Sequence, residues 1–108
     1  MSKYVFSVSL SPKEAMEKIK YEQNAELVHE DLFALGEDKY ICILVFEKYY
    51  FRVENRAALT VIIDNTTGKT RVKSIASGSS KGMIFNFDWG AGDSFARSIC
   101  NILAKYKI

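Results

Sequence analysis

The segment YICILVFEKYYFR, residues 40–52, constrains the fold more than any other part of this 108-residue chain. Successive side chains of a β-strand point to opposite faces, so the segment divides into two sets. One set is Ile41, Ile43, Val45, Glu47, Tyr49 and Phe51, and the other is Tyr40, Cys42, Leu44, Phe46 and Tyr50. A strand that is hydrophobic on both faces is typical of the interior of a sheet. The segment therefore predicts a long interior strand, at least over its first half.

The start of the first helix is the clearest local signal. YVFSVSL at residues 4–10 alternates like a half-buried strand, and SPKE follows at 11–14. Ser11 can cap a helix, Pro12 suits its first position, and Glu14 can reach back to complete a capping box. A hydrophobic stripe with helical spacing continues at Ala15, Met16 and Ile19. We expect this helix to end near Gln23.

Further strands are predicted on both sides of the long one. They are AELVHEDLFAL (25–35), ALTVIID (58–64), KTRVKSIAS (69–77) and a last strand, MIFNFDW (83–89). GEDK at 36–39 is typical of a turn, and NTTG at 65–68 predicts a hairpin. Gly68 is placed for a left-handed conformation in that hairpin.

The segment GMIFNFDWGAGDSF, residues 82–95, predicts a corner between the last strand and the second helix. Gly90 and Gly92 give the backbone freedom to turn, and Asp93 is placed to cap the helix that follows. The buried face of the strand is predicted to be Met83, Phe85, Phe87 and Trp89. The helical stripe after it is Phe95, Ile99, Ile102, Leu103 and Tyr106.

The resulting order, β-α-β-β-β-β-(β)-α, predicts one α+β domain over residues 1–108. We expect a curved antiparallel sheet with an N-terminal helix and a long C-terminal helix on one face. That order resembles the helix-grip and TATA-binding-protein-like folds. NAELVHE, FEKYYFR, NRAAL and GMIFNFDWGAGDSF also resemble segments of a family of short, uncharacterised bacterial proteins. That family has no assigned activity, so the resemblance implies no functional residue.

Composition places the chain among globular proteins. It is 48% hydrophobic and 13% aromatic, and no apolar run approaches the roughly 20 residues of a membrane span. Its two cysteines, Cys42 and Cys100, form no zinc-binding spacing and are expected to be free thiols in a reducing cytoplasm. No cofactor is expected.

Charge is distributed unevenly, although the net charge is only +2. Residues 14–47 hold nine acids and three bases, and residues 48–107 hold ten bases and four acids. Such asymmetry can indicate an acidic partner or nucleic acid. Because the bases are scattered singly, we expect instead that the two halves pair their charges when they fold.

Short motifs do not add up to an active site. GKT at 68–70 lacks the upstream glycine of a phosphate loop, where Ile63 stands, and a strand rather than a helix should follow it. Ser94 in GDSF lacks a base, since the only histidine is His29. His29 and Asp31 are too few to predict a metal site. A Cys42–His29 dyad is not favoured, because an apolar setting should keep that thiol protonated. The protein is therefore expected not to be an enzyme.

Two hypotheses about function remain. In the first, the protein binds another protein or itself through an open sheet edge or an exposed patch at Tyr49, Tyr50, Phe51 and Arg52. In the second, a cavity between sheet and helix binds a small apolar ligand. The cavity would be lined by Phe46, Phe85, Phe87, Trp89, Phe95 and Ile99. Nucleic acid is not favoured, because the glycines of RNA-binding sheets are missing. The first hypothesis is preferred, because those large side chains should fill a small interior.

Overall fold

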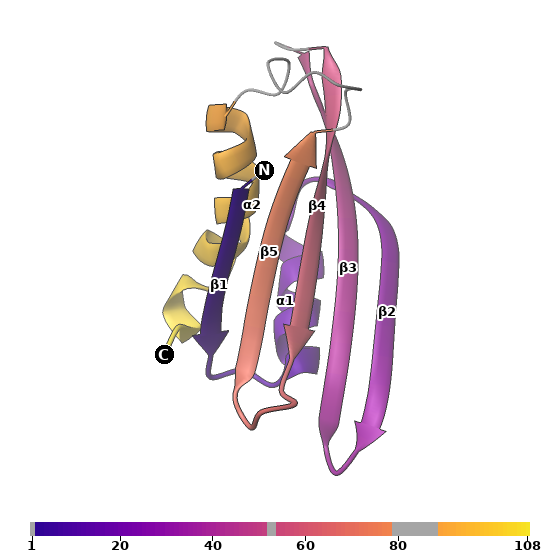
Figure 1. The fold of residues 1–108 in the computed structure, drawn as a ribbon, viewed down its shortest axis with the longest axis vertical. Helices are drawn as coiled ribbons and strands as arrows, with labels where there is room; N and C mark the ends of the chain where they lie inside the picture. Colours follow the sequence, from indigo (N-terminus) through magenta and orange to yellow (C-terminus); the bar gives the residue numbers. More distant parts are fainter. Residues whose placement is uncertain (1, 52–53, 79–88) are drawn as a thin grey trace.

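In the residues that the structure describes, five antiparallel strands and two helices make up the fold, which is α+β as predicted (Figure 1). The computed structural model describes residues 2–51, 54–78 and 89–108. Within these ranges, it describes only the backbone of residues 55 and 89–91. The strands are β1 (Ser2–Val8), β2 (Glu26–Gly36), β3 (Lys39–Tyr50), β4 (Asn55–Asp64) and β5 (Thr70–Gly78). The helices are α1 (Pro12–Glu22), α2 (Trp89–Ile102) and a 3₁₀ turn, η3 (Ala104–Tyr106). The last predicted strand, MIFNFDW at 83–89, lies outside the described residues apart from Trp89.

The sheet order is β1-β5-β4-β3-β2, and every neighbouring pair is antiparallel. Strands β2 to β5 are consecutive in the sequence and pair as hairpins. Strand β1, from the start of the chain, pairs with β5. The segment predicted to be an interior strand is β3, which pairs with β2 on one side and β4 on the other. This confirms the prediction from its two hydrophobic faces.

The turns and the first helix begin and end as their local sequences indicate. Gly36 and Gly68 both have positive φ, +88° and +102°, in the two predicted hairpin turns. At the start of α1, Ser11 accepts a hydrogen bond from the Glu14 amide at 3.2 Å. The Glu14 carboxylate in turn accepts one from the Ser11 amide at 2.9 Å. Both halves of the predicted capping box are therefore formed.

The second helix differs from its prediction at both ends. It begins at Trp89, so Gly90 and Gly92 lie inside the helix rather than at a corner, and Asp93 is not its cap. Glycine is a poor helix former, but packing decides helix formation more than intrinsic propensity does, and Gly92 is buried. The helix ends at Ile102, and the predicted stripe continues into η3.

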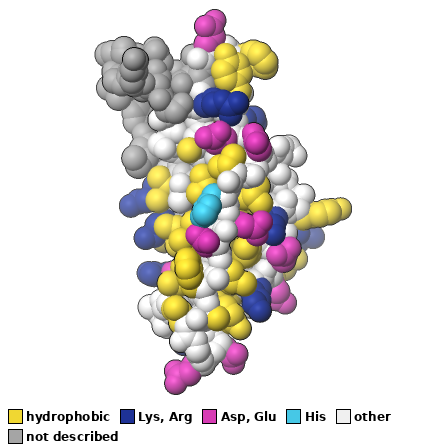
Figure 2. Space-filling model, turned by 90° about the vertical axis from the view of Figure 1, so that its right-hand side faces the viewer, with side chains coloured by type: hydrophobic (Ala, Val, Ile, Leu, Met, Phe, Trp, Pro, Cys, Tyr) yellow, Lys and Arg dark blue, Asp and Glu magenta, His cyan; other side chains and the backbone are white. Residues whose placement is uncertain are grey.

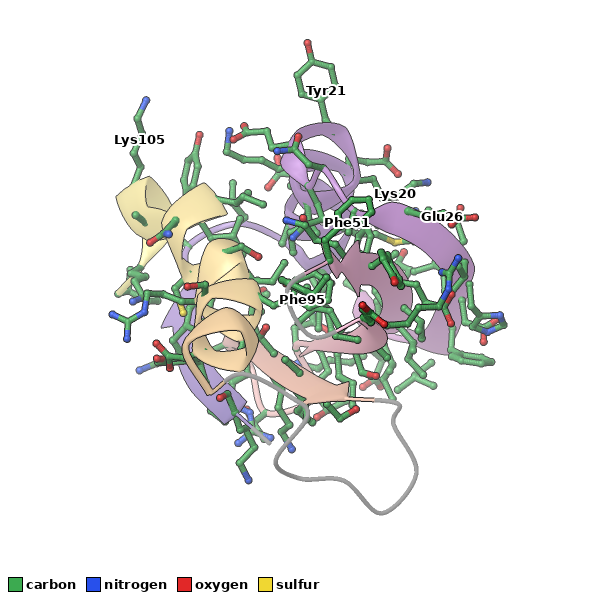
Figure 3. All side chains as sticks on the ribbon, turned by 90° about the horizontal axis from the view of Figure 1, so that it is seen from above. Lys20, Tyr21, Glu26, Phe51, Phe95 and Lys105 are labelled. Carbon is green, nitrogen blue, oxygen red and sulfur yellow. The ribbon has the colours of Figure 1, made fainter. Side chains whose placement is uncertain are left out.

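Both helices pack on the same face of the sheet, as predicted. Helix α1 contacts β3 and β4, helix α2 contacts β5 and β1, and the two helices contact each other. Figure 3, which looks along the strands, shows α1 and α2 on one side of the sheet, with Tyr21 pointing away from it. Ser74 is fully buried, and its hydroxyl donates to the Ala96 carbonyl at 2.9 Å, which fixes α2 to β5.

The hydrophobic core lies between this face and the helices. Its largest members are Phe46, Ile19, Leu44, Leu59, Ile63, Ile99 and Leu103. Burial of such side chains contributes about 1.5–3 kcal/mol each and is the main stabilising term of the fold. The opposite face of the sheet takes no part in this core.

Candidate interaction surface

The face of the sheet opposite the helices is the strongest candidate for a functional surface. We call it the open face, and in the described part of the chain neither helix contacts it. Alternation along the strands assigns its residues. They are Lys3, Val5 and Ser7 of β1; Arg71, Lys73, Ile75 and Ser77 of β5; Arg56, Ala58, Thr60, Ile62 and Asp64 of β4; Lys39, Ile41, Ile43, Val45, Glu47 and Tyr49 of β3; and Glu26, His29, Asp31 and Phe33 of β2.

Hydrophobic side chains occupy the middle of the open face. Val5 and Phe33 are about half exposed, at 51% and 48%. Between them lie the partly exposed aliphatic residues Ile41, Ile43, Val45, Ile62 and Ile75. A continuous apolar surface of this kind on a folded protein commonly marks a site of protein contact.

The strand register arranges these residues in rows across the sheet. One row runs Val5, Lys73, Ile62, Ile43, Asp31, and the next runs Lys3, Ile75, Thr60, Val45, His29. In the first row, a lysine on β5 and a carboxylate on β2 are separated by two isoleucines. The open face is therefore apolar along its centre and charged on both sides.

The charges on its two sides have opposite sign. Strands β1 and β5 contribute Lys3, Arg71 and Lys73 to the open face and no acid. Strands β2 and β3 contribute Glu26, Asp31 and Glu47, with Lys39 at the far end of β3 as the one base. The unequal charge of the two halves of the sequence thus becomes a separation of charge in space.

In the described residues, little of the expected pairing of charges between the two halves of the chain is formed. Among the ion pairs of the described residues, only Glu47–Arg56, at 3.0 Å, joins residues 14–47 to residues 48–107. Asp31 instead contacts His29, at 2.7 Å, on its own strand. Within the described ranges, Lys3, Arg71 and Lys73 lie within ion-pair distance of no carboxylate.

The predicted aromatic patch divides between the surface and the core. Tyr49 and Phe51 are 43% and 85% exposed, and their rings meet edge to face with centroids 5.0 Å apart. Tyr50 points to the other face and packs against Phe95 of α2, with centroids 6.0 Å apart. Burial raises the pKa of the Tyr50 hydroxyl. Arg52 lies outside the described residues.

The two edges of the described sheet differ. The C-terminal segment pairs with β1: the Ser9 amide donates to the Tyr106 carbonyl at 2.8 Å, and the Ile108 amide donates to Ser7 at 3.1 Å. Strand β2 is the other edge, and its pairing with β3 is interrupted by register shifts at Leu27/His29 and Ala34/Gly36. Leu27, Val28, His29 and Glu30 line a shallow, open depression there. Bulges and acidic side chains are devices that discourage edge-to-edge pairing.

The candidate catalytic groups are not brought together. His29 lies on the open face, whereas Cys42 faces the core and is fully buried, so they cannot form a dyad. Burial raises the pKa of the Cys42 thiol. Viewed from the β2 side, the histidine lies among acidic and hydrophobic side chains (Figure 2). In the part of the chain that the structure describes, no group of three or more His, Cys, Asp and Glu could hold a metal ion.

The remaining motifs have structural roles. Gly68 and Lys69 of GKT lie in the β4–β5 turn and Thr70 begins β5, so a strand follows rather than the helix of a phosphate loop. Ser94 is exposed on α2, which packs on β1 and β5, while His29 is on β2 at the far side of the sheet. Asp93 bonds to Tyr4 and to Arg97 rather than capping the helix.

The residues predicted to line a ligand cavity are part of the core where the structure describes them. Phe46, Phe95 and Ile99 are 1%, 3% and 0% exposed and belong to one packed cluster. Figure 3 shows Phe95 between α2 and the strands. Phe85 and Phe87 lie outside the described residues, and of Trp89 only the backbone at the start of α2 is described.

Sequence reasoning identified the alternating strands but missed the charge pattern of the open face. Lys73 and Asp31 are 42 positions apart in the numbering, and only the register of four strands places them in one row. The available signal was that Lys3, Arg71 and Lys73 fall at outward positions of strands that carry no outward acid.

The fold and this surface define a small α+β protein with an open antiparallel sheet. The chain belongs to a family of unknown function, DUF6054, which matches residues 1–107. This confirms the predicted resemblance to an uncharacterised family. No curated protein and no solved structure is similar enough to count as a match. None of the helices in the described ranges is long and apolar enough to cross a membrane.

Proposed function

We propose that this protein is a non-catalytic interaction module that associates with itself or with another protein through the open face and the adjoining Tyr49–Phe51 pair. The observation that carries the proposal is the continuous apolar centre of the open face, bordered by exposed Val5 and Phe33. Covering such a face removes hydrophobic area from water, which is the main driving force of protein association.

The two cysteines are consistent with a protein that works in a reducing cytoplasm. Cys42 and Cys100 are both free and buried. A binder of a small apolar ligand is the alternative. The burial of Phe46, Phe95 and Ile99 in one packed cluster favours the interaction module, because these side chains occupy the space that a ligand would need.

Sedimentation velocity over a wide range of protein concentration tests the proposal, together with capture of partners by immobilised wild type and an Ile43→Lys variant. Ile43 is on the open face between Asp31 and Ile62. Wild type should associate with itself or retain a partner, and Ile43→Lys should do neither while remaining folded. A wild type that is monomeric and retains no partner contradicts the proposal, as does full association by the variant.

A further inference from the structure

We infer that the partner of the open face is a second copy of this chain, packed face to face about a two-fold axis that runs parallel to the strands. The inference rests on the proposed function and names its partner. It follows from three features of the open face: its area, its apolar centre and its opposed charges.

The area of the open face is close to what a stable dimer needs. Five strands spaced about 4.8 Å apart make a surface about 24 Å wide. The central strands β4 and β5, of 10 and 9 residues, extend about 30 Å at about 3.3 Å per residue. The product, about 700 Å², approaches the roughly 800 Å² that each partner buries in a standard interface.

The apolar centre has the composition of a sheet-to-sheet core. Ile43 and Ile62 are paired in the register, as are Val45 and Thr60. Two sheets that pack face to face bring such side chains together with a spacing of about 10 Å. A second open face would supply the aliphatic side chains needed to interdigitate with these.

Charge selects the symmetry axis. A two-fold axis parallel to the strands places β1 and β5 of one copy over β2 and β3 of the other. Lys73 of each copy then approaches Asp31 of the other, because the two residues lie in the same row on opposite sides of the centre. A two-fold axis perpendicular to the strands would instead oppose Lys3, Arg71 and Lys73 with themselves, and like charges in an interface are strongly unfavourable.

The dimer would also supply a carboxylate partner for Lys73, on the basic side of the open face. In the described part of the chain, Lys73 is half-buried and has no carboxylate within ion-pair distance. Asp31 is also half-buried, with His29 as its neighbour. A contact repeated twice by symmetry, Lys73 to Asp31 and Asp31 to Lys73, is the isologous pattern of a two-fold dimer.

Association through the β2 edge is the competing arrangement of two copies. An antiparallel β2–β2 pair would bring Glu26, Glu30 and Asp31 of both copies close together. The register shifts in β2 also interrupt the regular hydrogen-bonding edge that such pairing requires. The open face carries neither obstacle.

Charge exchange between copies tests the inference. Lys73→Glu and Asp31→Lys should each weaken self-association at least tenfold in sedimentation equilibrium, because each creates two like-charge contacts. An equimolar mixture should recover near-wild-type affinity as a heterodimer, and the double variant Lys73→Glu/Asp31→Lys should recover it as a homodimer. Lys105→Glu, on exposed η3, is the matched control and should leave the affinity unchanged.

Cysteine crosslinking checks, independently of charge, which face of the protein is buried in the dimer. Because facing sheets lie about 10 Å apart, too far for a direct disulfide, a short bismaleimide should crosslink two copies of Thr60→Cys, at the centre of the open face, but not Tyr21→Cys, on α1 and 89% exposed. A wild type that is monomeric at millimolar concentration overturns the inference and leaves the proposed function with a different protein as partner. A dimer that crosslinks through Tyr21→Cys, or that Lys73→Glu does not weaken, also overturns it, while self-association itself stands.

Discussion

The hydroxyl of Tyr4, on β1, donates a hydrogen bond to the carboxylate of Asp93, on α2, across 89 positions of the sequence. Arg97 completes the group, because its guanidinium contacts Asp93 at 2.6 Å and donates to the Tyr4 oxygen at 2.9 Å. These three side chains join the first strand to the last helix. Asp93, inside α2, thus contacts β1 and the next turn of its own helix instead of capping the helix.

The first prediction concerns the pH dependence of this group. The Tyr4 hydrogen bond, followed by Arg97, lowers the pKa of Asp93 below its ordinary value of 3.8. A carboxyl with a lowered folded-state pKa stabilises the fold above its unfolded pKa, and this contribution is lost as the pH falls through the folded pKa. Asp93→Asn should therefore lower the free energy of unfolding more at pH 7 than at pH 2.

Urea denaturation at both pH values measures this effect. Asp38→Asn, in the exposed β2–β3 turn, is the control for removing a surface carboxylate. Equal destabilisation by Asp93→Asn at pH 7 and pH 2 would mean that the charge of Asp93 does not contribute to stability.

The second prediction concerns the cap of α1. Ser11→Ala removes the hydroxyl that accepts from the Glu14 amide at 3.2 Å, and loss of such a cap costs about 1 kcal/mol. Chemical denaturation should show a loss of this size in the free energy of unfolding. Ser9→Ala, two residues earlier and exposed, should show much less. Equal losses in the two variants would contradict a specific capping role.

Local and distant interactions account for what the sequence could and could not predict. The α1 cap was predictable because Ser11 and Glu14 are three residues apart, and β3 was predictable because its pattern reports burial on both faces. The start of α2 was not predictable, because two glycines within four residues favour a bend unless distant packing holds them in a helix.

The candidate surface was predictable only in its aromatic part. Tyr49 and Phe51 follow a charged stretch of β3, which indicated that this end of the strand reaches solvent. The charged rows of the open face depend on which strands are neighbours and in what register. Hydrophobic alternation fixes which face a side chain lies on, but not which residue of another strand lies beside it.

The third prediction separates the two aromatic neighbours at the end of β3. Tyr50→Glu places a charge against Phe95 at the edge of the core and should strongly lower the melting temperature. Phe51→Glu changes a side chain that is 85% exposed and should leave the melting temperature near that of wild type. If the Tyr49–Phe51 pair adjoins the contact surface, Phe51→Glu should also weaken association.

Circular dichroism melts and sedimentation velocity on the same samples provide both measurements. Tyr21→Glu, 89% exposed on the helix side of the molecule, is the control for adding a charge at the surface. A Phe51→Glu protein that unfolds, or a Tyr50→Glu protein that is as stable as wild type, would reverse the assignment of the two faces.

The last prediction tests the interaction module against the apolar-ligand alternative. If Phe46, Phe95 and Ile99 fill the space between sheet and helices, benzene or a medium-chain fatty acid should not raise the melting temperature of the wild type. A ligand that binds the folded state adds about 2.7 kcal/mol of stability at a hundredfold excess over its dissociation constant, so binding would be visible. Phe46→Ala supplies the positive control. Removing this fully buried ring should cost about 3–5 kcal/mol and leave an apolar cavity, which benzene can fill and so restore part of the loss. Should Phe46→Ala prove too unstable to study, Ile99→Val removes a single methylene at about 0.5–1.5 kcal/mol and retains the fold for comparison. Saturable stabilisation of the wild type by either probe would make a ligand cavity the better account of the space between the sheet and the helices.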